Sequence, residues 1–545
     1  MATFCNRCED AVEEGFDLWD ELAEIDALLE RLRLKRYDLK RKINQLHSPI
    51  VRQLPPDVTR TIFEFCLPDF TDHQLSPYAK EDLSIPLSFG AICSYWRDIA
   101  WSTPSLWSSL VVHVPSRHDP HIATDIAQEW LARSGQLPLS IRIFSEYYGY
   151  EAVSALANII NQYSTRWSDL DFHMPSYFYK CFHATDNLAP ILKSIRFDRS
   201  HNMMDLNFQL TCPRLERASL SFFPLDGINI QWDNLTHLSL HSMFIFDSLL
   251  ILRKTPRLVF CEVSGSCPRS YREPSIEPAL TSLRSLRLWS TSNDAQVFLN
   301  NLIAPQLEEF SLPGFYYPPK EGIRLITSFL RRSACSLRSF SIMFRIFPPY
   351  LKCFMDLLQS MPSLNTLSII SITTTTRYSK NITFEDYLPG NIMHLLAKIL
   401  SSQSTSIQQR FLPNLKILEY TGKLYLFPGD YDDRYSLPPA DNAVHGPLHL
   451  LKLDLYPATL IPKNVISFLS NLVERGVAVN VLSKSEDILQ SSIDYYRCRK
   501  DSLSRDWADN LNLDSSLFFW PLWIISNWKV KVNTFYFDQP GCSSK

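Results

Sequence analysis

The chain has 545 residues, of which 45% are hydrophobic and 20% charged, and its formal net charge is −3. This length allows several domains and a large core, and the near-neutral charge gives no sign of a nucleic-acid or anionic-membrane partner. The N-terminus lacks a basic region followed by an apolar run, and the apolar stretch 517–525 is shorter than the roughly 20 residues of a membrane helix. We therefore expect a soluble protein of the cytoplasm, the nucleus or both.

The chain shows no motif that indicates catalysis. Glycine is scarce, and we find no phosphate-binding glycine loop, no GxSxG elbow and no HExxH motif. The twelve cysteines are scattered, as is typical of reduced thiols. Cys5 and Cys8 form a single CxxC, but zinc needs about four ligands and no second pair lies at ligand spacing. We expect no cofactor, no metal and no catalytic residues.

Residues 1–48 contain a helical heptad pattern that ends at Ser48 and Pro49, since proline cannot continue a helix. The pattern favours a coiled coil or a long amphipathic helix. Arg36 interrupts the short run, so we expect the helix to fold back onto its own chain. Self-association or binding to a partner is the alternative. The apolar positions alternate at spacings of four and three: Leu18, Leu22, Ile25, Leu29, Leu32, Leu39, Ile43 and Leu46.

Residues 49–110 carry two further helical patterns, rich in large apolar side chains and opened by prolines. In the first, Val58, Ile62, Phe65 and Cys66 share a face, with Phe63 beside it. The second runs from Pro86 to Thr103, with Phe89, Ile92, Cys93, Trp96 and Ile99 at spacings of three and four. So short a segment cannot bury this much apolar surface alone, which indicates a docking surface for another protein.

The order LPPDV…IF…CLP followed by AICSYWRDIA…TPSLW resembles an F-box, in the form found in large fungal sets of such proteins. The spacer between the helices is longer than in compact members, and Tyr95 stands where the family often has a basic residue. The resemblance implies that an all-α domain binds a Skp-type adaptor and, through it, a cullin. It assigns adaptor binding to Leu54, Pro55, Pro56, Val58, Ile62, Phe63, Ile92, Cys93, Trp96, Leu106 and Trp107. The alternative is an ordinary three-helix cap that buries its own aromatic residues.

Residues 111–485 repeat an apolar-xx-apolar-x-apolar pattern, usually just after a proline. Most copies begin roughly 20 to 30 residues apart, in or near the range of leucine-rich repeats, with helical stretches between them. We therefore expect an irregular α/β solenoid in which stacked repeats build a shared core. The first apolar positions are Trp167, Leu192, Leu215, Leu235, Leu258, Leu283, Leu307, Leu337, Leu364, Leu415 and Leu450.

Two long insertions, 371–390 and 428–447, interrupt the repeats and are either binding loops or tolerated surface loops. Residues 486–545 contain the apolar stretch 518–528, which we expect to cap the last repeat.

The F-box resemblance implies a substrate receptor of an SCF-type (Skp, cullin, F-box) ubiquitin ligase, with an unknown protein substrate on the solenoid. A scaffold that binds the adaptor without a cullin is the alternative.

Overall fold

The computed structural model describes the chain in segments. These are residues 6–47, 54–67, 85–114, 120–145, 150–198, 208–223, 225–266, 278–290, 292–313, 319–344, 351–371, 411–422, 448–455, 461, 463–483 and 486–503.

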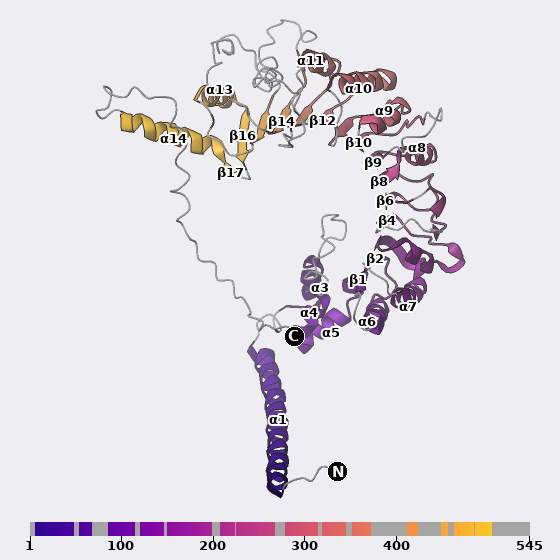
Figure 1. Ribbon diagram of the computed structural model, residues 1–545, viewed down its shortest axis with the longest axis vertical. Coiled ribbons are helices and arrows are strands. Elements are labelled where there is room, and N and C mark those ends of the chain that lie inside the picture. Colours follow the sequence, from indigo (N-terminus) through magenta and orange to yellow (C-terminus); the bar gives the residue numbers. More distant parts are fainter. Residues whose placement is uncertain are drawn as a thin grey trace.

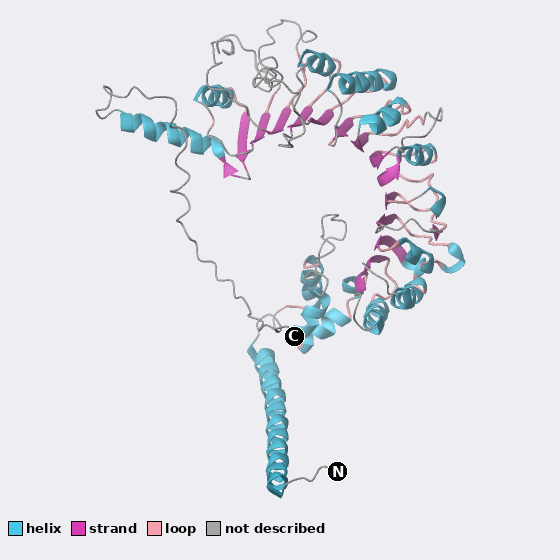
Figure 2. Cartoon of the chain, viewed as in Figure 1, coloured by secondary structure: helices cyan, strands magenta, loops and turns pink. Residues whose placement is uncertain are grey.

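A long curved sheet dominates these segments. Its strands line the inner side of an arc and most helices lie on the outer side (Figures 1 and 2). Every adjacent pair in this sheet is parallel except β16 with β17. The strands are β1 (Ser109–Val114), β2 (Leu139–Ser145), β3 (Trp167–His173), β4 (Ser194–Asp198), β6 (Arg217–Ser221), β8 (His237–Phe244), β9 (Phe260–Ser266), β10 (Ser285–Ser290), β11 (Glu309–Leu312), β12 (Ser339–Phe344), β13 (Thr366–Ser371), β14 (Ile417–Gly422), β15 (Leu450–Leu455), β16 (Ala478–Ser483) and β17 (Glu486–Asp487).

Helices and short parallel strands connect the strands of the arc. A separate small sheet pairs β5 (Phe208–Gln209) with β7 (Ile228–Asn229). The α-helices of the arc are α6 (Pro120–Arg133), α7 (Tyr150–Asn161), α8 (Ile245–Arg253), α9 (Ser292–Asn300), α10 (Pro319–Ser333), α11 (Leu351–Gln359), α13 (Lys463–Glu474) and α14 (Ile488–Leu503). The expected α/β repeat architecture is confirmed at this level.

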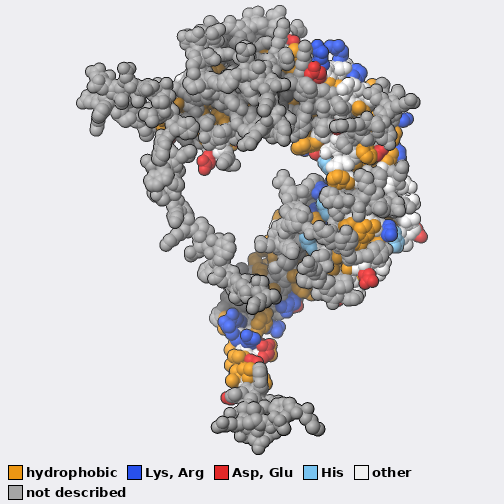
Figure 3. All heavy atoms as spheres, in the orientation of Figure 1, with side chains coloured by type: hydrophobic (Ala, Val, Ile, Leu, Met, Phe, Trp, Pro, Cys, Tyr) orange, Lys and Arg blue, Asp and Glu red, His pale blue; other side chains and the backbone are white. Residues whose placement is uncertain are grey.

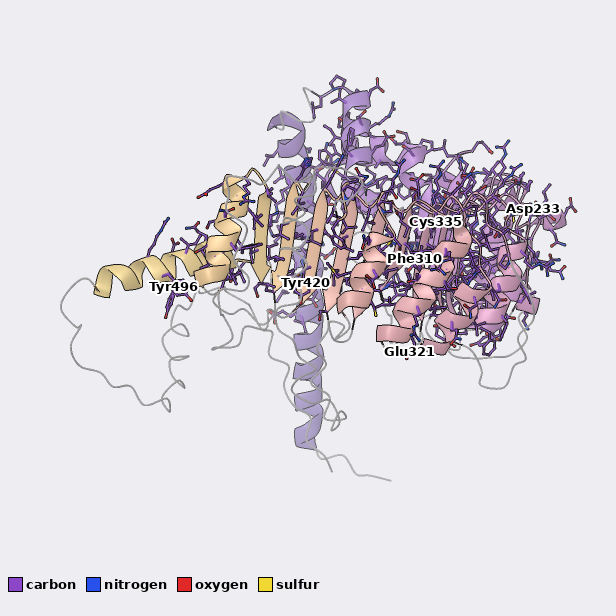
Figure 4. All side chains as sticks on the ribbon, turned by 90° about the horizontal axis from the view of Figure 1, so that it is seen from above. Asp233, Phe310, Glu321, Cys335, Tyr420 and Tyr496 are labelled. Atoms are coloured by element: carbon purple, nitrogen blue, oxygen red, sulfur yellow. The ribbon has the colours of Figure 1, made fainter. Side chains whose placement is uncertain are left out.

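The recurring apolar triplets form the core between strands and helices. In one copy Leu215, Ala218 and Leu220 are buried, and Leu220 lies beside Leu240 of the next copy. Phe310, labelled in Figure 4, is buried against Phe329 of α10, with ring centroids 5.4 Å apart. Each strand thus stacks its inward side chains on those of its neighbour, so that no repeat buries its apolar face alone.

The expected first position of the last copy was wrong by two residues. Leu450 pairs with Ile417 in the sheet, and neither is fully buried. The buried position equivalent to Leu415 is Leu448. The run LHLLKLDL fits the triplet spacing from either Leu448 or Leu450, and both starting points place the buried Leu453 inward, so periodicity alone does not separate the two registers.

The repeats begin earlier than the sequence pattern indicated. The sheet starts at Ser109, two strands before the copy at Trp167, so the expected boundary at residue 110 lies inside β1. Trp107, Leu110 and Val112 are buried and have the spacing of a repeat triplet. Trp107 and Trp167 are also alike in their hydrogen bonding, because each indole N–H donates to the carbonyl oxygen seven residues earlier.

Polar side chains link neighbouring repeats along one edge. The Asn234 amide donates to the Pro213 carbonyl oxygen at 2.9 Å, and the Asn414 amide donates to that of Pro362 at 2.9 Å. Both asparagines directly precede the first leucine of a triplet. These bonds satisfy carbonyl groups that the parallel ladder leaves unpaired at the turn.

Helix α1 (Asn6–His47) projects away from the arc (Figure 1). Every described side chain of this helix, from residue 21 to residue 43, is exposed. Over residues 21–43 the expectation that the helix folds back onto its own chain was therefore wrong, and this part of the apolar seam is exposed.

Several sequence predictions fall outside the described residues: those on Cys5, on 372–390, on 428–447 and on 518–528. Within the described segments, no helix combines the length and the apolar character that crossing a membrane requires.

Candidate functional site

The segment between α1 and the sheet folds into three short helices, α3 (Pro56–Phe65), α4 (Ile85–Ile92) and α5 (Ser94–Trp101), followed by a single turn, η2 (Pro104–Trp107). Pro56 opens α3 at a position where a missing N–H costs no hydrogen bond. The expected continuous second helix is instead broken at Cys93, whose backbone is extended. The Cys93 sulfur accepts a hydrogen bond from the Trp96 backbone N–H at 3.4 Å and so caps α5.

Aromatic rings hold the three helices together. Phe63 of α3 stacks on Phe89 of α4 with ring centroids 4.1 Å apart, and Trp96 of α5 meets Phe63 edge-on at 5.0 Å. Gly90 allows this close packing, because a Cβ atom there would lie 2.1 Å from the Trp101 ring. Most of the described aromatic rings of the segment are thus packed against one another within it.

A second aromatic group joins this segment to the sheet. Trp107 is fully buried, with its ring 5.2 Å from that of Trp101 and 4.8 Å from that of Trp130 on α6. The Arg133 guanidinium lies over the Trp107 ring at 5.1 Å. The helical segment therefore covers the first edge of the solenoid core.

Five large apolar side chains remain exposed on this segment and form what we call the apolar helix faces: Val58, Ile62 and Phe65 on α3, and Leu87 and Ile92 on α4. The three on α3 follow the spacing i, i+4, i+7 and so share one face, which lies beside the buried face that holds Thr59 and Phe63. Phe65 is 86% exposed and Ile62 is 42% exposed. Solvent exposure of aromatic and branched side chains at helical spacing is typical of a surface that another helix covers.

The structure divides the residues that the F-box resemblance assigned to adaptor binding. Phe63, Leu106 and Trp107 are at most 1% exposed, so they support the fold and offer no surface to a partner in this conformation. Leu54, Cys93 and Trp96 are partly buried, while Pro55, Pro56, Val58, Ile62 and Ile92 are exposed.

Sequence reasoning left two residues out of the predicted docking set. Phe65 and Leu87 belong to the apolar helix faces. The helical spacing from Val58 to Phe65 already carried the signal for Phe65. No sequence signal marked Leu87, which lies outside the row of apolar positions from Phe89 to Ile99.

The inner face of the sheet carries a partly buried ionic cluster on β2, β3 and β4. The Asp171 carboxylate lies 2.7 Å from the Arg142 guanidinium and 2.9 Å from Nε2 of His173. Nδ1 of His173 lies 3.5 Å from the Asp198 carboxylate. Burial alone lowers the pKa of His173, but the hydrogen bonds and charges of Asp171 and Asp198 outweigh it and raise the pKa to about 9.

This pKa predicts a pH dependence of stability. Because the folded pKa exceeds the unfolded value near 6.5, the stabilisation is complete below about pH 6.5 and is lost as pH rises through about 9. We expect the free energy of unfolding to fall by about 2 to 3 kcal/mol over that window in the wild-type chain, and to fall by less in His173→Gln. Urea unfolding of the wild-type chain and of the His173→Gln variant at pH 6.5 and pH 9 measures the difference. Equal losses in the two chains would contradict this role for His173.

Comparison with known proteins gives no family assignment. No family model matches the chain, and no curated protein matches it. The crystal structure of a Bacteroides fragilis protein, a structural-genomics target, aligns with 69% of this chain and 77% of its own, at 11% sequence identity and a TM-score of 0.26. A likeness this weak leaves the family of the chain unassigned.

Proposed function

We propose that the helical segment 54–107 binds a Skp-type adaptor and that the chain serves as a substrate receptor of an SCF-type ubiquitin ligase. The observation that carries the proposal is the pair of apolar helix faces on α3 and α4. The packed rings of Phe63, Phe89 and Trp96 form the aromatic core of the segment without them, and each side chain of the apolar helix faces is at least 42% exposed. Their position within the F-box-like sequence favours an adaptor as the partner.

The solenoid supports the second half of the proposal. Its parallel strands, seen from above in Figure 4, carry charged side chains on the inner face, such as Arg142 on β2, Asp171 on β3 and Arg196 on β4. Extended curved surfaces of this kind bind protein ligands in other repeat proteins. The receptor would act by proximity. Holding a substrate lysine near a ubiquitin-conjugating enzyme that carries ubiquitin raises the effective concentration of that lysine, and the receptor needs no catalytic side chain of its own.

Reconstitution tests the proposal. We expect the purified chain to form a stable complex with a Skp-type adaptor, and that complex to bind a cullin on size-exclusion chromatography. Adaptor binding without cullin binding would favour the scaffold alternative. A chain that binds no Skp-type adaptor would overturn the proposal.

A further inference from the structure

The exposed seam of α1 is an apolar surface that the described part of the chain leaves uncovered. Within residues 21–43 it consists of Leu22, Ile25, Leu29, Leu32, Leu39 and Ile43, all about half exposed. Their alternating spacing is that of the a and d positions of a coiled coil, with Arg36 at the one polar a position.

Charge divides the helix into two halves. Residues 9–30 contain ten acidic and no basic side chains, whereas residues 31–47 contain seven Lys or Arg and only one acidic side chain. Figure 3 shows the basic side chains gathered on the part of α1 nearest the three-helix segment, with acidic ones beyond them. A partner that covers the seam must therefore be basic at one end and acidic at the other, as a reversed copy of the same helix is.

A parallel pair of these helices would bring like charges together. With Leu22 at position a, Glu21 takes position g and Asp26 the following e, so they would face each other across a parallel seam. Lys35 and Lys40 would meet in the same way, and Arg36 would face its own copy in the core.

An antiparallel pair removes these conflicts in one register. In this register Leu22 packs against Leu39, and Leu29 against Leu32. Glu21 then faces Lys42 and Asp26 faces Arg33, and the symmetry of the dimer forms each of these pairs twice.

Arg36 then lies opposite Ile25, whose neighbours in sequence are acidic, so the Arg36 guanidinium can extend to the edge of the seam. Sliding the helices by one heptad either way sets Asp26 against Asp26 or Arg33 against Arg33.

The ion pairs that these side chains make within one helix do not oppose such pairing. Arg33 lies 3.5 Å from Glu30, and Lys42 lies 2.8 Å from Asp38, in exposed positions. Exposed pairs of this type contribute little to stability, so exchanging or sharing them does not oppose dimer formation.

We propose that α1 pairs with α1 of a second copy as an antiparallel coiled coil in this register. The chain is then a homodimer whose helices overlap over residues 14–47, with the paired apolar positions running from 18 to 43. The two His47 ends point in opposite directions and lie about 50 Å apart along the axis, at 1.5 Å per residue. A dimer so built carries its two three-helix segments and two solenoids at opposite ends.

Sedimentation equilibrium on the full purified chain, without adaptor, tests the dimer independently of adaptor binding. We expect a dimer at micromolar concentration that Leu29→Glu weakens by at least about 100-fold, because two carboxylates enter the seam. Leu34→Glu is the matched control, since Leu34 is an exposed leucine of the same helix outside the seam. A monomeric wild-type chain, or equal weakening by both variants, would overturn the proposal.

Charge reversal tests the orientation. Glu21→Lys places a second ammonium group opposite Lys42 in the antiparallel register and should raise the dimer Kd by roughly tenfold, and adding Lys42→Glu should restore it. In a parallel dimer the same Glu21→Lys change would instead face Asp26 and tighten the dimer. Tightening by the single change, or no rescue by the double change, would refute the antiparallel arrangement.

Discussion

Trp107→Ala is expected to destabilise the N-terminal end of the solenoid by about 3 to 5 kcal/mol, in the range for truncating a fully buried aromatic residue. The ring fills the space between α5, η2 and α6, and its indole N–H donates to the Ala100 carbonyl oxygen at 2.7 Å. Removing it leaves a cavity and deletes this short hydrogen bond, so that the Ala100 carbonyl keeps the donor from the Thr103 backbone N–H at 3.3 Å. Thermal unfolding of the whole chain, together with hydrogen exchange of the amides in β1 and α5, measures the effect.

The control for this change is Trp289→Ala. Trp289 lies on β10, is 44% exposed and makes a surface hydrogen bond to Glu262, so its loss should cost about 1 kcal/mol or less. Because repeats contact mainly their neighbours, exchange in β13 to β16 should stay unchanged in Trp107→Ala. If the two alanine variants unfold alike, Trp107 does not join the helical segment to the sheet.

The role of Trp107 shows where sequence reasoning stops. Its TPSLW context points to a docking residue, yet the side chain occupies the first position of a repeat triplet and is wholly buried. Both uses require a large apolar residue after a proline. Only the register of β1 against β2, which pairs Leu110 with Ile141, separates them.

Helix α3 shows a similar limit. Helical periodicity identified an apolar face containing Val58, Ile62 and Phe65, but Phe63 stands on another side of the same helix. Either face is apolar enough to be buried. The structure buries Phe63, because Phe89 and Trp96 meet it there, and periodicity within one helix carries no information about such tertiary contacts.

The repeats were the most predictable part. Their triplets recur often enough that errors in one copy do not disturb the others, and the expected first positions from Trp167 to Leu415 are all buried. The misassigned Leu450 lies where the local sequence allows two registers, and the unrecognised copy at β2 departs from the triplet because only one residue separates Leu139 from Ile141. The copy at β1 keeps the triplet spacing but overlaps the segment that resembles an F-box. A bulge at Leu139 and Ser140 shifts the pairing of β2 with β3 by one residue.

Ile62→Glu is expected to weaken capture of a Skp-type adaptor by about 100-fold, since a carboxylate would enter an apolar contact at the centre of the α3 face. Ile62 is 42% exposed and makes no part of the Phe63–Phe89 stack, so the variant should keep its fold. Trp96→Ala is a poorer test, because Trp96 packs edge-on against Phe63 and its loss would disturb the helices themselves. Pull-down with purified adaptor, with circular dichroism on the same samples, measures both effects.

The matched control is Ile126→Glu on α6, because Ile126 is 48% exposed and the substitution adds the same charge outside the apolar helix faces. We expect it to bind adaptor like the wild-type chain. Ile92→Glu on α4 should act in the same direction as Ile62→Glu, because both side chains are exposed on helices that share one aromatic core. Capture that is lost with Ile62→Glu but kept with Ile126→Glu would locate the contact on α3. Capture that all three variants retain would show that the apolar helix faces serve something other than an adaptor.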